Sequence, residues 1–197
     1  MAERKGLRKA EANIIALSSK INESRSSGRY CDVNFLVDGK SFKCHRLIVG
    51  SASEFFDVMF HSNFKESHAE EIVLKEIKAS AFGEVLQFIY TGNVIITELN
   101  LFDMIRASEF YKLPGIENLC VEYIQTNMGR LIENVFEIFT YIRTIQKPAL
   151  IDAFSEYIRK HFDYFSKTDV FLDISFDDLN TILKKSLPSK NQNVLLD

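Results

Sequence analysis

The residues able to hold a metal ion are scattered along the chain. They are Cys31, Cys44, His45, His61, His68, Cys120 and His161. Protein zinc sites draw on closely spaced pairs such as Cys-x-x-Cys or His-x-x-x-His, and no such pair occurs in this set. The spacing therefore predicts no metal site.

Catalytic motifs are equally missing from the sequence. The eight glycines are dispersed and form no phosphate-cradling loop. There is no nucleophile elbow and no His-Glu-x-x-His run. We therefore expect a protein that is not an enzyme and that needs no cofactor.

The sharpest candidate for binding chemistry is the segment Phe64-Lys65-Glu66, which polar residues such as Ser62 and Asn63 surround. A partly exposed aromatic side chain beside a carboxylate is typical of an interface hot spot with a polar rim. The other interpretation is a local anchor for a loop, because a three-residue pattern often occurs by chance.

Composition narrows the class of partner. The chain has 197 residues, a net charge of −3 and 26% charged residues, and its basic cluster at residues 4–9 is offset by Glu3 and Glu11. This balance argues against nucleic acid as a partner. No apolar run is long enough for a membrane span or a signal peptide. Three cysteines without framework spacing favour a reducing compartment, the cytoplasm or the nucleus.

A β-hairpin is the clearest element that could position these residues. Apolar and polar residues alternate from Val33 to Val37, and Asp38 with Gly39 suits a two-residue turn. Folding about that turn sets Phe35 opposite Phe42 and brings Cys44 onto the same apolar face.

A Phe-rich helix should follow the hairpin. Ser51 or Ser53 can cap its first turn. Its apolar side carries Phe55, Phe56, Met59 and Phe60.

Further along the chain, strands and helices are mixed. Short strands are predicted at 71–74 and 94–96, and a helix from residue 82 should stop at Gly92. Asn100 is a candidate cap for the next helix. From residue 127 the pattern is helical only, with Pro148 at the start of one helix and Ser175 capping another. The sequence thus predicts an α+β domain at 8–126 and an all-α domain at 127–197.

Before the hairpin, Ile14, Leu17 and Ile21 form a narrow apolar stripe on a helix. The helix could pack on its own domain or against another subunit.

Several short motifs, in this order, resemble the BTB (POZ) domain over residues 8–126. They are GRYCDV at 28–33, CHRLIV at 44–49, SASEFF at 51–56, MF at 59–60, FIYTG at 88–92 and ASEFYKL at 107–113. The remainder resembles the start of a BACK domain, as in Kelch-like adaptor proteins. The chain ends at Asp197 without Kelch repeats, so the resemblance implies that a substrate would bind a region missing from this chain.

The resemblance implies a homodimeric adaptor that binds the N-terminal domain of cullin-3 in a RING ubiquitin ligase. The stripe of Ile14, Leu17 and Ile21 would then help form the dimer.

Cullin binding is implied at the Phe-x-Glu step. Phe64 would fill a pocket between cullin helices and Glu66 would hydrogen-bond at its edge. Phe60 and Tyr111 are lesser candidates for the same surface, and core packing is the stronger expectation for Phe60. The first BACK helices, residues 132–161, would add contact with the cullin.

Asp32 and Arg46 form a further candidate. The hairpin register places Arg46 near Cys31 and Asp32, where opposite charges could pair. The family has a charged pocket near its dimer interface, and a structural role is expected here for Asp32 and Arg46.

The competing interpretation of the whole chain is a dimerisation scaffold for transcriptional corepressors. Such a scaffold would act through the groove around Asp32 and Arg46 and would not need Phe64. Cys31, near Arg29 and Arg46, could also be a reactive thiol.

Overall fold

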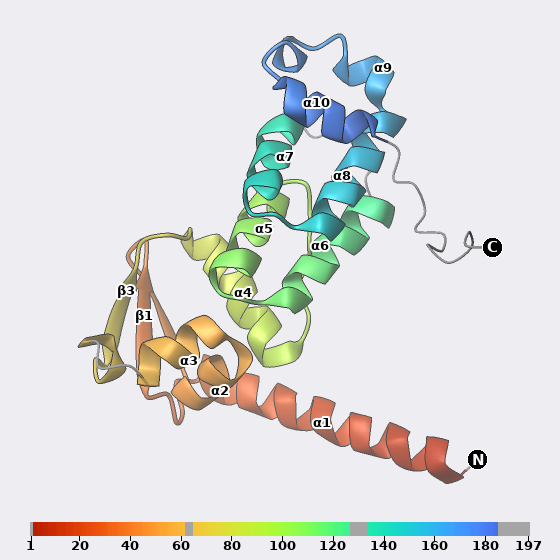
Figure 1. The fold of residues 1–197 in the computed structure, drawn as a ribbon. Helices are drawn as coiled ribbons and strands as arrows, with labels where there is room; N and C mark the ends of the chain where they lie inside the picture. Colours follow the sequence, from red (N-terminus) through yellow and green to blue (C-terminus); the bar gives the residue numbers. More distant parts are fainter. Residues whose placement is uncertain (1, 62–64, 127–133, 185–197) are drawn as a thin grey trace, which may run out of the picture. The chain divides into compact units, whose positions relative to one another are not determined.

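The computed structural model describes residues 2–61, 65–126 and 134–184, without the side chains of residues 2–9 and of Glu66 (Figure 1). Contacts within the chain divide it into two compact units, Met1–Cys120 and Val121–Asp197. Each unit is described by itself below.

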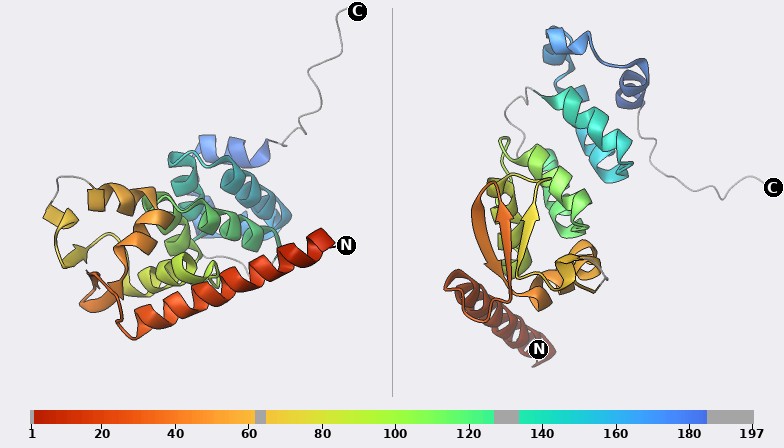
Figure 2. Two further views of the ribbon diagram at one scale, coloured as in Figure 1. Left: turned by 90° about the horizontal axis from the view of Figure 1, so that it is seen from below. Right: turned by 90° about the vertical axis from the view of Figure 1, so that its left-hand side faces the viewer.

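Unit 1 is built on a three-stranded sheet with the order β2-β1-β3 (Figure 2). Its strands are β1 (Val33–Val37), β2 (Lys40–Cys44) and β3 (Glu71–Leu74). Asp38 and Gly39 have φ angles of 48° and 75°, as a tight hairpin turn requires. The turn pairs Phe35 with Phe42 and Val33 with Cys44, so the predicted register is confirmed. Strand β3 runs parallel to β1.

Helices make up the rest of unit 1. They are α1 (Ala2–Ser26), α2 (Arg46–Ala52), α3 (Glu54–His61), the 3₁₀ turn η1 (Lys65–Ser67), α4 (Ala79–Thr91), α5 (Leu101–Phe110) and α6 (Pro114–Thr126), which crosses the division into units. The Ser53 hydroxyl accepts the Phe56 N–H at 3.3 Å, so Ser53 and not Ser51 caps α3. Gly92 ends α4 in the left-handed conformation, with φ 73°, as predicted.

Two predictions made for residues 94–100 are wrong. Residues 94–96 are described, and they form no strand. The Asn100 side chain does not cap α5. Its amide oxygen accepts the Thr97 N–H at 2.8 Å and its amide nitrogen donates to the Ile95 carbonyl at 2.8 Å. Asn100 therefore holds the preceding loop in shape.

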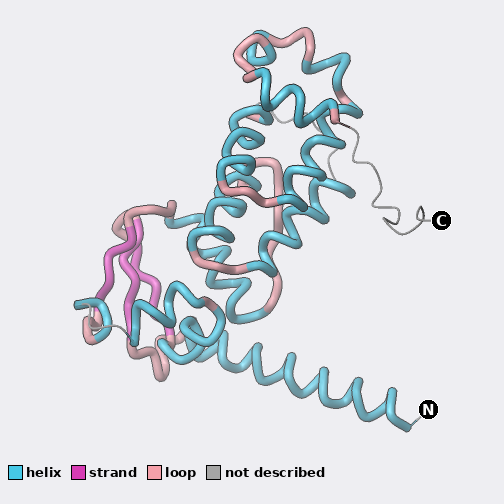
Figure 3. The backbone as a smooth tube through the Cα atoms, in the orientation of Figure 1, coloured by secondary structure: helices cyan, strands magenta, loops and turns pink. Residues whose placement is uncertain are grey.

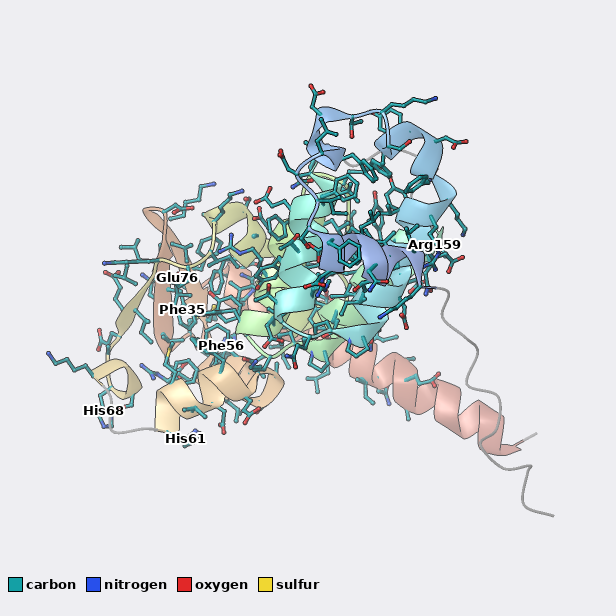
Figure 4. All side chains as sticks on the ribbon, turned by 45° about the horizontal axis from the view of Figure 1, so that its top comes forward. Phe35, Phe56, His61, His68, Glu76 and Arg159 are labelled. Carbon is teal, nitrogen blue, oxygen red and sulfur yellow. The ribbon has the colours of Figure 1, made fainter. Side chains whose placement is uncertain are left out.

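An aromatic cluster forms the centre of unit 1. The Phe35 ring lies 5.3 Å from Phe56 and 5.4 Å from Phe82, measured between ring centroids (Figure 4). Tyr111 stacks on Phe56 at 5.0 Å. Since these rings come from β1, α3, α4 and the end of α5, the cluster ties the sheet to the helices that cover it.

The described part of unit 2 contains helices and no strand (Figure 3). The helices after α6 are α7 (Val135–Thr144), α8 (Pro148–Lys160), α9 (Phe162–Phe165), η2 (Asp169–Phe171) and α10 (Phe176–Leu183). Pro148 begins α8, and the Ser175 hydroxyl accepts the Asp178 N–H at 3.0 Å to cap α10. The predicted fold class, an α+β domain followed by helices, is confirmed. The boundary between residues 126 and 127 stays a prediction.

No helix in the described ranges combines the length and the apolar character that crossing a bilayer requires.

Candidate protein-binding site

Along the sequence, the candidate site follows α3 and extends into η1, because Glu66 belongs to that turn. Phe64 falls outside the described residues, and so does the side chain of Glu66. The structure therefore describes the site through its two flanks, with His61 at the end of α3 on one side and the residues from Ser67 to His68 on the other (Figure 4).

Arg46 joins these two flanks. On the α3 side, its guanidinium lies over the Phe60 ring, 4.8 Å from the centroid. On the η1 side, it donates to the carbonyl oxygens of Ser67 at 2.9 Å and Ala69 at 2.5 Å. Hydrogen bonds from a charged donor are stronger than neutral ones, and stacking on an aromatic face adds to them. One side chain from α2 therefore fixes both ends of the segment that contains Phe64. We call Arg46 and these partners the Arg46 clamp.

Asp32 meets Arg46 through main-chain groups. Its carboxylate accepts the backbone N–H of Arg46 at 2.7 Å, at the first residue of α2. The Arg46 Nε atom donates to the carbonyl oxygen of Asp32 at 3.3 Å. The expected pairing of the two charged side chains is therefore corrected: the residues are neighbours, but the carboxylate binds a helix N–H and the guanidinium binds carbonyls.

Phe60 is half-buried and belongs to its own domain's packing. Its ring centroid lies 6.3 Å from that of Phe35 and 6.3 Å from that of Phe56. Because the Arg46 guanidinium also stacks on its ring, Phe60 helps to hold the end of α3 in place.

Tyr111 is 1% exposed and lies in the aromatic cluster. Its expected place on a docking surface is corrected, because a side chain this buried offers no area to a partner. Its hydroxyl has no hydrogen-bond partner in the structure as described. Burial, and to a lesser extent the Glu76 carboxylate, raises the pKa of Tyr111, so the hydroxyl stays protonated.

Helix α1 presents an apolar face. Ile14 is 67% exposed and Leu17 59%, whereas Ile21 is half-buried. Ile15, which was not part of the stripe predicted from the sequence, is 69% exposed. Four large aliphatic residues within two turns of one helix, three of them exposed, are typical of a surface that another chain covers.

The second half of α1 packs within unit 1, against α4 (Figure 2). The Ser18 hydroxyl donates to the carbonyl oxygen of Tyr90. The Arg25 guanidinium lies over the Tyr90 ring at 5.0 Å. This packing holds α1 by its C-terminal half and leaves Ile14 and its neighbours exposed.

The thiols are poorly suited to act as nucleophiles. Burial raises the pKa of Cys44 and of Cys120 to about 12. Burial also raises the pKa of Cys31, despite the nearby Arg25, which argues against the reactive thiol that we considered there. Within the described ranges, no group of three or more His, Cys, Asp or Glu residues could hold a metal ion.

The BTB/POZ domain family matches residues 21–128, more than half of the chain. The chain belongs to the BTB/POZ family. The BTB domain of zebrafish PATZ1 has the same fold, with a TM-score of 0.53 and 24% sequence identity over 59% of this chain and 95% of that domain.

Curated relatives of this BTB/POZ chain are Kelch-like proteins, as the sequence motifs predicted. Kelch-like protein 40 of Xenopus tropicalis is 27% identical over 85% of the chain, and Kelch-like protein 7 of Rattus norvegicus is 25% identical over 93%. The human Kelch repeat and BTB domain-containing protein 8 is 32% identical over 79%. The chain spans only 27%, 31% and 26% of the length of these three relatives.

Proposed function

We propose that this protein is a homodimeric adaptor that binds the N-terminal domain of cullin-3 as the substrate-receptor subunit of a RING ubiquitin ligase. The BTB/POZ match together with Kelch-like relatives along most of the chain carries the proposal. Such an adaptor works in the cytoplasm or the nucleus by holding two partners at a fixed distance, without catalysis.

The proposed cullin site is Phe64 with Glu66. The segment follows α3, and the Arg46 clamp contacts the Phe60 ring before it and the main-chain carbonyls of Ser67 and Ala69 after it. Ordered neighbours support binding, because residues that are already ordered lose less conformational entropy when a partner binds. An aromatic anchor beside a carboxylate suits an interface hot spot.

Calorimetric titration of a cullin-3 N-terminal fragment into the full chain tests this site. Replacing Phe64 and Glu66 together by alanine should weaken binding by about 2 kcal/mol or more, because a large anchor and its polar neighbour are lost. Tyr30→Ala is the matched control, since Tyr30 is an aromatic residue of unit 1 that is 85% exposed. It should leave the affinity unchanged.

Two outcomes of this titration contradict the proposal. Tight binding that survives the double substitution excludes the proposed residues while keeping the partner. Absence of binding by the unmodified chain excludes the partner and favours the corepressor scaffold. The structure favours that alternative less, because the polar groups of Arg46 are already bonded within its own domain.

The dimer is proposed to form through the exposed face of α1. Replacing Ile14 and Leu17 together by aspartate should halve the mass measured by light scattering, because two charges would have to be buried at the interface. Leu99→Asp is the control, since Leu99 is 96% exposed and lies outside α1. A folded Ile14→Asp, Leu17→Asp variant that keeps a dimeric mass would exclude this face.

The remaining parts of the proposal concern unit 2. We assign residues 127–197 to the start of a BACK domain, whose first helices, residues 132–161, would extend the cullin contact. Residues 127–133, and Ile132 with them, lie outside the described residues. The substrate would bind outside residues 1–197.

A further inference from the structure

A polar cavity of about 370 Å³ lies between the C-terminal end of α1 and strand β2. Arg25 and Lys43 bring two positive charges to its lining, and Ser26, Ser27 and Ser41 bring three hydroxyl groups. We call this cavity the basic pocket. Its volume is that of a small-ligand site, but its lining is polar where such sites are mostly apolar. The ligand it fits is therefore small and charged.

Both cations have donors to spare. In the part of the chain that the structure describes, the Lys43 ammonium has neither a hydrogen-bond nor an ion-pair partner. Arg25 donates from Nε to the Asn22 side chain at 3.0 Å, and its two terminal nitrogens have no hydrogen-bond partner among the described residues. The Lys43 side chain is exposed, but its stem passes close to Gly28, because its Cδ atom would lie 3.4 Å from a methyl group placed on that glycine. Its stem thus lies along the glycine.

A simpler role for these cations would be to neutralise the negative end of α1, where the last carbonyl groups of a helix lack partners. The chain satisfies the carbonyls of residues 22–25 by other means. Gly28, with φ 71°, donates to the carbonyl of Arg25 at 2.9 Å, and Arg29 donates to that of Ser24 at 2.8 Å. This is the Schellman arrangement that ends many helices.

Serine hydroxyls satisfy the carbonyls further back. Ser26 donates to the carbonyl of Asn22 at 3.0 Å, and Ser27 donates to that of Glu23 at 3.0 Å. The carbonyls of residues 22–25 therefore have partners that are not lysine or arginine side chains. The Lys43 charge remains available to a ligand. The Arg25 guanidinium lies over the Tyr90 ring at 5.0 Å, but its two terminal nitrogens can still donate hydrogen bonds.

We propose that the basic pocket binds an oxyanion with the charge of a phosphate group. The Lys43 ammonium and the terminal nitrogens of Arg25 would donate to its oxygens, and charge-assisted bonds of this kind are the strongest that the lining can make. The group has two sources, a phosphorylated side chain of a partner protein or free phosphate. Phe42 also lines the cavity and offers apolar contact to the carbon atoms that carry a phosphoryl group.

Titration of the full chain at constant ionic strength tests the proposal. Inorganic phosphate and a short phosphoserine peptide are added separately, and the amide NMR shifts of Ser27, Gly28 and Lys43 are followed. Lys43→Met, which keeps the stem and removes the charge, should weaken binding about tenfold. Lys40→Met is the matched control, since Lys40 is exposed on the same strand but does not line the pocket. It should change the affinity by less than about twofold, the size of a screened surface effect.

The arms of the experiment separate the sources. Tighter binding of the phosphoserine peptide than of phosphate identifies a phosphorylated partner, and equal affinities identify the free ion. The proposal is overturned if the unmodified chain shows no saturable shifts, if the two lysine variants lose affinity equally, or if the unphosphorylated peptide binds as well. Lys43→Gln repeats the test if Lys43→Met fails to fold.

Discussion

Each unit buries one polar side chain that invites comparison, and the two are treated in opposite ways. In unit 2, Asp178 is 4% exposed and fully engaged, with Arg143 on one carboxylate oxygen and Thr140 on the other at 3.0 Å. In unit 1, Tyr111 is 1% exposed and its hydroxyl is without a partner among the described residues. A buried charge therefore needs a partner, whereas the packing of an aromatic ring can compensate for a buried hydroxyl that has none.

The physical reason is the cost of leaving water. An ionised carboxylate without a partner is far more costly to bury than a hydroxyl. The hydroxyl of Tyr111 is attached to a ring that stacks on Phe56 at an interplanar angle of 9° and meets Phe55 edge-on at 5.3 Å. These aromatic contacts and the burial of the ring offset the lost hydrogen bond.

Breaking the pair in unit 2 should have the largest effect. Arg143→Met leaves the Asp178 carboxylate buried with fewer partners and should lower the free energy of unfolding by about 3 kcal/mol. Urea unfolding followed by circular dichroism measures the loss. Lys160→Met is the control, because it removes an exposed ion pair with Glu156 on α8 and should cost no more than about 0.5 kcal/mol. Equal losses in the two variants would show that burial does not decide the energetics here.

A smaller loss is expected where α3 meets Tyr111. The Ser53 hydroxyl caps α3 and donates to the carbonyl oxygen of Tyr111 at 2.6 Å. Ser53→Ala should therefore lower the free energy of unfolding by about 1–2 kcal/mol, since a cap and a buried hydrogen bond are lost together. Thermal and urea unfolding measure it against Ser51→Ala, an exposed serine nearby. A similar cost at Ser51 would contradict the assignment of the cap.

The smallest effect should have the opposite sign. Tyr111→Phe removes the hydroxyl that lacks a partner and should raise the free energy of unfolding by up to about 1 kcal/mol. The same substitution at Tyr90 is the control. The Tyr90 hydroxyl accepts the His45 N–H at 2.9 Å, so Tyr90→Phe should destabilise the protein by about 1 kcal/mol. A loss at both positions would indicate that Tyr111 has a hydrogen-bond partner in solution.

The hairpin could be predicted from the sequence because its determinants are local. Asp38 and Gly39 set the turn, and the turn sets the register that pairs Phe35 with Phe42. Residues 94–96 have equally good strand composition, yet they form no strand in the structure. A strand depends on a neighbouring strand as much as on its own residues, and composition does not reveal whether a neighbour is present.

At the candidate site, too, local features could be predicted and contacts with distant residues could not. The hairpin register correctly placed Arg46 beside Asp32, since neighbours across a hairpin follow from the pairing. It could not tell that the guanidinium turns toward the carbonyls of Ser67 and Ala69, because any residue type supplies a carbonyl. The burial of Tyr111 was missed for a related reason: it depends on rings from two other helices, α3 and α4.

The Arg46 clamp affects which amino-acid substitutions its partners tolerate. Arg46 binds the main-chain carbonyl oxygens of Ser67 and Ala69, and every residue type has such an oxygen. Substitutions at Ser67 and Ala69 that leave the main chain in place should therefore keep both hydrogen bonds, so sequence change at these two positions is compatible with an unchanged Arg46.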